Sequence, residues 1–138
     1  MRDLLIAIRR RWDSRNLDAT ITGGLHTGRL PPDIAMPYCV LTTLGSVPEY
    51  TTTQSHVERY PLQFAFFGTD DDLLLGWSDI FDRAFNHAAL IFDGQSKSML
   101  SERSGRQLIL DVERLEGRDV WQVLLEYMFT VQHELIEG

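Results

Sequence analysis

Hydrophobic residues near the start of the chain repeat with the spacing of an α-helix. Within Asp3–Asp13 they occupy positions i, i+1, i+4 and i+8 and would share one helix face: Leu4, Leu5, Ile8 and Trp12. Ile6 lies among the polar residues of the other face. An isolated exposed Ile is common on protein surfaces, and a contact point for a partner is the other interpretation. The pattern predicts an amphipathic helix with one side against a core.

A stretch punctuated by glycine and proline, Asn16–Pro37, separates this helix from two segments rich in strand-forming residues. We expect a short strand near Leu25 and longer strands over Tyr38–Leu44 and Val57–Phe67. The polar residues between the two longer strands, Gly45–His56, are too many for a tight turn. They predict a projecting hairpin loop.

The clearest helical pattern follows the second of these strands. Its apolar residues repeat over several turns and would form one buried stripe: Leu73, Leu74, Trp77, Ile80, Phe81, Ala84, Phe85 and Ala88. Thr69 or Asp70 can cap the start of the helix, and Asp72 would complement its positive N-terminus. We expect the helix to end near His87–Leu90.

Two further strands complete the pattern. Gly, Ser and charged residues make Asp93–Arg106 a predicted flexible connector. Leu108–Val112 alternates apolar and polar residues as a half-buried strand does, and a turn is expected at Glu116–Arg118. From Trp121 to Val131 the odd positions are apolar, which predicts a last strand with one packed face.

The predicted elements follow each other in the order α-β-β-α-β-β. Two helices with narrow apolar stripes and four strands with one apolar face pack most simply as two layers. We therefore predict a single α+β domain over residues 1–138, with a four-stranded, mainly antiparallel sheet and both helices on one face.

Charge and composition restrict the function classes. The chain has 13 basic and 20 acidic side chains, a formal net charge of -7 at pH 7. This charge disfavours a protein that grips nucleic acid over its whole surface, because phosphates would be repelled. No apolar run approaches the roughly 18 residues of a membrane span, so we expect no membrane partner. The single cysteine, Cys39, excludes an intramolecular disulfide.

Side chains that could carry chemistry do not fall into a known catalytic or ligand-binding spacing. Gly23 and Gly28 are spaced as in a phosphate-binding loop, but Arg29 and Leu30 follow instead of Lys and Ser or Thr. The consecutive Asp70–Asp72 would point apart, which suits helix capping better than metal ligation. The histidines are scattered: His26, His56, His87 and His133. We predict no catalytic residues, no metal site and no cofactor.

Arginines make the first helix locally basic. Arg9 and Arg10 lie away from its apolar stripe, where an acidic partner could dock. A solvated helix face is the alternative interpretation of such a cluster. Nucleic acid fits less well, since the rest of the chain would repel phosphate.

Several short sequence motifs, spread along nearly the whole chain, follow one another in the same order as in a known protein family. They are the Leu4–Ile8 helix, the Ile21–Gly23 segment, the approach to a strand over Pro31–Tyr38, the Pro61–Phe64 strand with the following Gly68, the aromatic-rich second helix and the terminal hairpin. In these motifs and their order the chain resembles the tail terminator and tail completion proteins of long-tailed bacteriophages and prophages. These are minor tail proteins that act in head-tail joining.

The resemblance implies a structural protein that is not an enzyme and uses no cofactor. It would form a ring, often hexameric, at the head-proximal end of the tail. Its partners would be other copies of itself, the tail tube and head-tail connector proteins, first in the cytoplasm of a bacterial host and then in the virion tail. A head-to-tail ring needs two different surfaces on each subunit. The candidate interface residues are Ile6, Arg9, Arg10, Val47, Tyr50 and Ile136.

Two other functions stay open from the sequence. The first is a protein-interaction module of the same fold with a partner unrelated to phages. The second is a small ligand-binding or hydrolytic domain whose site is assembled from distant residues such as Cys39, His56 and Asp111. A deep pocket with converging titratable groups would favour the second function.

Overall fold

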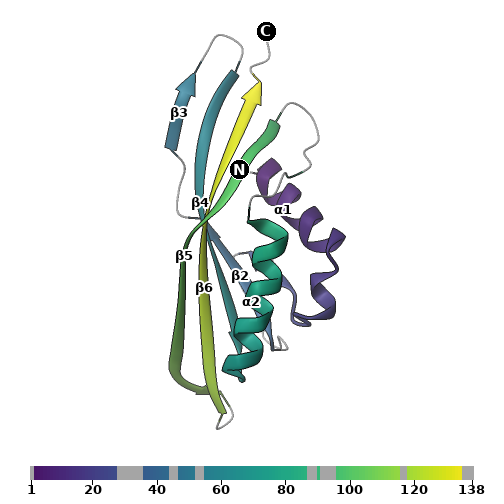
Figure 1. Cartoon of the computed structure of the whole chain (residues 1–138), viewed down its shortest axis with the longest axis vertical. Coiled ribbons are helices and arrows are strands. Elements are labelled where there is room, and N and C mark those ends of the chain that lie inside the picture. Colours follow the sequence, from purple (N-terminus) through teal and green to yellow (C-terminus); the bar gives the residue numbers. More distant parts are fainter. Residues whose placement is uncertain are drawn as a thin grey trace.

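The computed structural model describes residues 2–27, 36–43, 47–51, 55–86, 90, 96–115 and 118–134. Figure 1 shows the elements along the chain. They are α1 (Arg2–Ser14), the 3-10 helix η1 (Leu17–Ala19), β1 (Leu25–Thr27), β2 (Tyr38–Thr43), β3 (Val47–Thr51), β4 (Ser55–Gly68), α2 (Asp71–Phe85), β5 (Ser96–Leu115) and β6 (Arg118–Glu134).

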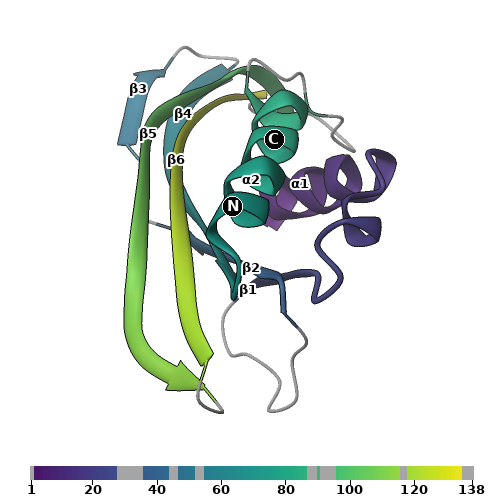
Figure 2. The same ribbon diagram turned by 60° about the horizontal axis from the view of Figure 1, so that its bottom comes forward.

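The strands form one six-stranded sheet in the order β1-β2-β4-β6-β5, with β3 paired to β4 outside this path. β1 and β2 run parallel, and the other pairs are antiparallel. β2 pairs with the second half of β4, and β3 pairs with its first half. The sheet is strongly curved, and both helices lie within its hollow side (Figure 2).

Local hydrogen bonds set the two ends of α2. The carboxylate of Asp70 accepts a hydrogen bond from the backbone N–H of Leu73 at 3.1 Å, which confirms one of the two predicted caps. At the other end, the backbone N–H of Asn86 donates to the carbonyl of Asp82 at 2.7 Å, and Asn86 is extended. The helix therefore stops slightly before the predicted end at His87–Leu90.

The core combines apolar side chains of both helices with those on the hollow face of the sheet. Phe81 of α2 is completely buried, and its ring centroid lies 4.6 Å from Phe64 and 5.0 Å from Phe66 of β4. The same ring lies 6.0 Å from Trp12 of α1 and 5.8 Å from Tyr127 of β6. One aromatic ring therefore contacts both helices and the two central strands of the sheet.

The predicted α+β class is confirmed, with two helices on one face of a mainly antiparallel sheet. The four predicted long strands are present as β2, β4, β5 and β6, and the short strand expected near Leu25 is β1. With β3 added, the sheet has six strands rather than four. In the part of the chain that the structure describes, no helix combines the length and apolar character needed to cross a bilayer.

Two predictions of irregular structure were wrong. Val47–Thr51, part of the predicted loop Gly45–His56, form β3. They do so along the half of β4 that β2 leaves unpaired, where they satisfy its backbone groups. Most of the predicted connector Asp93–Arg106, from Ser96 onwards, belongs to β5, which pairs with β6. Pairing with a long neighbouring strand outweighs the weak strand propensity of these polar residues.

Replacement of the central ring should destabilise the fold strongly. Phe81→Ala removes a side chain that fills its site, and we expect the free energy of unfolding to fall by about 3–5 kcal/mol. Leu73→Ala is the matched control on the same helix, because the Leu73 side chain is 52% exposed. It should change the free energy of unfolding by less than about 0.5 kcal/mol. Urea titrations followed by tryptophan fluorescence measure both values, and similar losses in the two variants would contradict this assignment of the core.

Candidate interaction surfaces

The three consecutive arginines of α1 have different surroundings. Arg9 donates a hydrogen bond from Nη2 to the carbonyl oxygen of Leu25 at 2.7 Å. Arg11 donates from Nε to the carbonyl oxygen of Ala84 at 2.8 Å. Arg9 thus holds α1 against β1, and Arg11 holds α1 against α2. Arg9 and Arg10 are both exposed.

Part of the predicted interface forms a continuous surface on α1, which we term the α1 patch: Leu5, Ile6, Arg9 and Arg10. Ile6 is 40% exposed. These four residues and Thr27 line a surface hollow of about 500 Å³. An adjoining hollow of about 300 Å³ shares Leu5 and Thr27 and continues along β2 over Val40–Thr43. Among the described residues, neither lining contains a carboxylate, an imidazole or a thiol, which are the titratable groups that the ligand-binding or hydrolytic alternative would need there.

The other predicted interface residues lie elsewhere. Val47 and Tyr50 belong to β3, where their backbones pair with Arg59 and Val57 of β4. β3 and α1 are well separated in both views of the ribbon (Figures 1 and 2). Ile136 lies outside the described residues. The structure therefore brings Ile6, Arg9 and Arg10 together but does not add Val47 or Tyr50 to the same surface.

A second apolar surface lies on α2, where the sequence predicted burial. Leu73 is 52% exposed and Ile80 is 40% exposed, although both were assigned to the buried stripe. At about 100° per residue, they lie roughly 100° around the helix from the buried Leu74 and Phe81. Gly76 falls between them, and a Cβ built on it would meet no atom within 4 Å. With the exposed carboxylates beside them, these residues form what we term the α2 patch: Asp72, Leu73, Gly76, Asp79 and Ile80.

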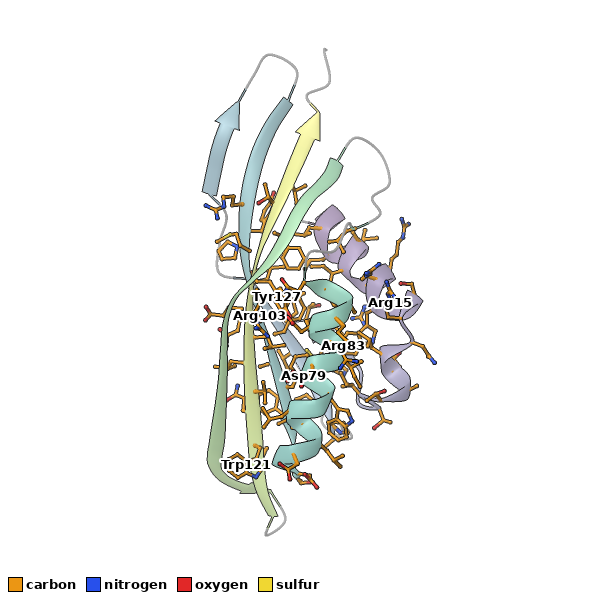
Figure 3. All side chains as sticks on the ribbon, viewed as in Figure 1. Arg15, Asp79, Arg83, Arg103, Trp121 and Tyr127 are labelled. Atoms are coloured by element: carbon orange, nitrogen blue, oxygen red, sulfur yellow. The ribbon has the colours of Figure 1, made fainter. Side chains whose placement is uncertain are left out.

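A cluster of polar side chains joins α2 to the long hairpin. The hydroxyl of the buried Tyr127 donates to Oδ1 of Asp82 at 2.6 Å. The guanidinium of Arg103 lies 3.3 Å from Oδ2 of the same carboxylate, and the Arg103 backbone N–H donates to the side chain of Asn86 at 3.0 Å. Figure 3 shows Arg103 and Tyr127 at the junction of α2 with β5 and β6. Both carboxylate oxygens are engaged in structural contacts, so the cluster fixes α2 against the sheet.

The residues of the hydrolytic alternative are not assembled. Cys39 pairs with Phe66 of β4, whereas His56 lies at the other end of that strand, about 33 Å away along it. Asp111 lies in β5, three strands away from Cys39 in the sheet order. Burial raises the pKa of the Cys39 thiol well above its ordinary value, and the opposing charge of Arg9 is the smaller effect. This thiol stays protonated at neutral pH and is a poor nucleophile.

Within the described part of the chain, metal-binding side chains do not converge either. Among the residues that the structure describes, no group of three or more His, Cys, Asp or Glu side chains could hold a metal ion. The Nε2 atom of His26 lies 2.6 Å from the carbonyl oxygen of Gly23, where the ring stabilises the turn before β1. Asp70 caps α2, as described above.

Comparison with known proteins finds similarity at the level of the fold. A chain in the solved structure of the virion of a native gene transfer agent (GTA) particle superimposes with a TM-score of 0.61 over 84% of this chain and 84% of that chain. The two sequences are 14% identical, so the similarity concerns the arrangement of the elements. No protein family model matches this sequence, and no curated protein does.

Tyr60 should make the stability of the fold sensitive to alkaline pH. Burial, the hydrogen bond with Glu58 and the charge of that carboxylate raise the pKa of Tyr60 from 10.0 to about 12. Because the folded value exceeds the unfolded one, the unfolded chain loses this proton first as the pH rises. The contribution of the Tyr60 hydroxyl to the free energy of unfolding is fully present below pH 10 and is lost between pH 10 and about 12.

Comparison with Tyr60→Phe isolates this contribution from the other alkaline titrations. We expect the variant to lose less free energy of unfolding than the wild type between pH 10 and 12. Urea titrations at a series of pH values provide the measurement. Parallel pH profiles for the two proteins would show that Tyr60 titrates normally in the folded state.

Proposed function

We propose that this protein is a structural component of a phage or prophage-derived particle, where it forms a ring that caps the head-proximal end of the tail and joins it to the head. The observation that carries the proposal is the fold shared with a chain of a gene transfer agent virion over 84% of both lengths. The motifs quoted from Leu4–Ile8 to the terminal hairpin resemble tail terminators in the same order, which supports the position of the ring in the particle.

The surfaces of the chain support an assembly role. In the described residues, no three His, Cys, Asp or Glu side chains converge on a metal site, and Asp82 and His26 are engaged in structural contacts. Two apolar patches with charged borders are exposed instead, one on α1 and one on α2. A ring of identical subunits needs two different surfaces on each copy, and these patches meet that requirement.

The net charge also suits a ring through which DNA passes. With a formal charge of -7, a wall formed by this protein would repel the phosphate backbone and let the duplex slide. A ring structure with a basic inner wall would count against this part of the proposal.

Electron microscopy of the protein with tail tubes tests the proposal directly. Tubes assembled from a tail tube protein encoded in the same genome should acquire a ring-shaped cap at one end only, and capped tubes should join to connector-bearing heads. Tubes incubated without the protein are the control. Bare tube ends at a saturating concentration of the folded protein would contradict the tail-capping function and favour an interaction module with another partner.

Deletion of the gene from the cell that produces the particles is a second test of the tail-capping function. A cap that stops tube growth predicts tubes of excessive and variable length and heads without tails, and the gene supplied in trans should restore both. Normal particles from the deletion strain would exclude this role. Location of the gene away from tube and tape-measure genes would favour the non-phage module.

A further inference from the structure

Exposed apolar side chains concentrate on two places of the molecule. Among the described residues, the large hydrophobic side chains that are exposed are Ile6, Leu73 and Ile80. Ile6 belongs to the α1 patch, and the other two belong to the α2 patch. Apolar residues exposed in this way beside charged groups are typical of interaction sites.

The two patches of one molecule cannot contact each other. On the side of α1 that faces α2, Arg11 donates its hydrogen bond to Ala84, and the ring of Trp12 lies 6.0 Å from that of Phe81. Ile6 lies about 140° around α1 from Arg11, so the α1 patch is turned away from α2 of the same chain. The α2 patch of the same chain therefore does not cover the α1 patch.

The patches are complementary in charge. Arg9 and Arg10 border the apolar part of the α1 patch, and Asp72 and Asp79 border that of the α2 patch. All four side chains are exposed. Opposite charges at the borders of two apolar surfaces favour their encounter and disfavour contact of either patch with itself.

The patches are also complementary in shape. Leu73 and Ile80 project on either side of Gly76, where open space takes the place of a side chain. Residues at i, i+3, i+4 and i+7 of one helix form the hole that receives a side chain of a facing helix. Positions 73, 76, 77 and 80 have this spacing, and Ile6 is a projecting side chain of suitable type.

One register satisfies the charges along both helices. If the helices run parallel with Ile6 opposite Gly76, then Arg10 comes beside Asp79 on one flank of the contact. Asp13 follows Ile6 by as many residues as Arg83 follows Gly76, so in this register Asp13 and Arg83 also come beside each other. Both of these side chains are exposed. The contact therefore pairs opposite charges at successive turns.

We propose that the α1 patch of one copy docks on the α2 patch of the next copy, with Ile6 in the gap above Gly76. When each copy uses its two different surfaces with two different neighbours, repetition of the contact generates a ring or a helix. It rests on the proposed ring function, for which it supplies the subunit interface. The hollow beside Leu5 and Thr27 gives room for the side chains of the α2 patch.

Disulfide trapping tests the contact in its predicted register. Ile6→Cys and Gly76→Cys copies, mixed and added to tail tubes, should form a crosslinked dimer under mild oxidation, because a close helix contact brings the two Cα atoms within about 7 Å. The native Cys39 is buried and should stay unreactive. Neither single variant should crosslink alone. Arg15→Cys mixed with Gly76→Cys is the matched control, since the exposed Arg15 lies beyond the end of α1.

Filling the gap provides a test that does not depend on cysteine chemistry. Gly76→Leu should fold and melt at the same temperature or higher, because the site is open and leucine favours a helix more than glycine does. The same variant should cap roughly tenfold fewer tubes, since its side chain occupies the space of Ile6. A variant that melts normally and caps tubes normally would overturn the proposal.

Charge exchange tests the pairing itself. Arg10→Glu should reduce capping roughly tenfold, because it places a carboxylate beside Asp79. The double variant Arg10→Glu with Asp79→Arg should recover most of the activity. Arg10 is used instead of Arg9, which holds β1 in the folded monomer. Loss of capping without any recovery in the double variant would contradict this pairing.

The outcomes separate this interface from the function on which it rests. Wild-type protein that caps tubes while the mixed cysteine variants stay uncrosslinked would remove the interface and leave the function intact. Wild-type protein that fails to cap tubes would remove the function, and trapping in concentrated protein without tubes would still test the interface. A crosslink formed by Ile6→Cys alone would indicate a two-fold dimer and would overturn the head-to-tail contact.

Discussion

The packing of Phe81 between two helices and the curved sheet is the constraint on which the rest of the structure depends. Its ring contacts Trp12 of α1 and Phe64 and Phe66 of β4 within one buried cluster. Because a close-packed ring admits little rotation of the helix that carries it, Phe81 fixes which side of α2 meets the sheet. The outward direction of Leu73, Gly76 and Ile80 follows from that choice. The surface is thus a consequence of the core.

Hydrogen bonds at the border of the core then fix the elements relative to one another. Asp82 holds the hydroxyl of Tyr127 and the guanidinium of Arg103, the indole N–H of Trp12 donates to Asp18 at 2.7 Å, and Arg11 caps a carbonyl of α2. These are the side chains that in an enzyme would be available for proton transfer or charge stabilisation. Here their hydrogen bonds join α1, α2 and the sheet.

The sequence was informative wherever a local pattern decides the structure. Helical spacing located α1 and α2, alternation located the long strands, and Asp70 was among the expected caps. β3 and the first half of β5 were missed because their pairing with β4 and β6 depends on residues distant in the chain. Leu73 and Ile80 were placed in the core because apolar spacing alone does not give the width of the buried arc. A helical wheel centred on Leu74 and Phe81 would have placed them at its edge. Arg9 was predicted as an interface residue, and its contact with Leu25 could not be inferred without knowing that β1 lies beside α1.

The hydrogen bond between Arg9 and Leu25 has a consequence for how sheets can join. β1 is a terminal strand of the sheet order, and the end strand of a sheet can template the addition of a strand from another molecule. At this border the guanidinium already occupies the Leu25 carbonyl that such a strand would need as an acceptor. Fusion of two sheets into one continuous ladder is therefore discouraged on this side. Recognition of another molecule at the β1 edge must therefore depend on side chains. Mutation can change side-chain contacts more finely than backbone hydrogen bonds, which every sequence can form.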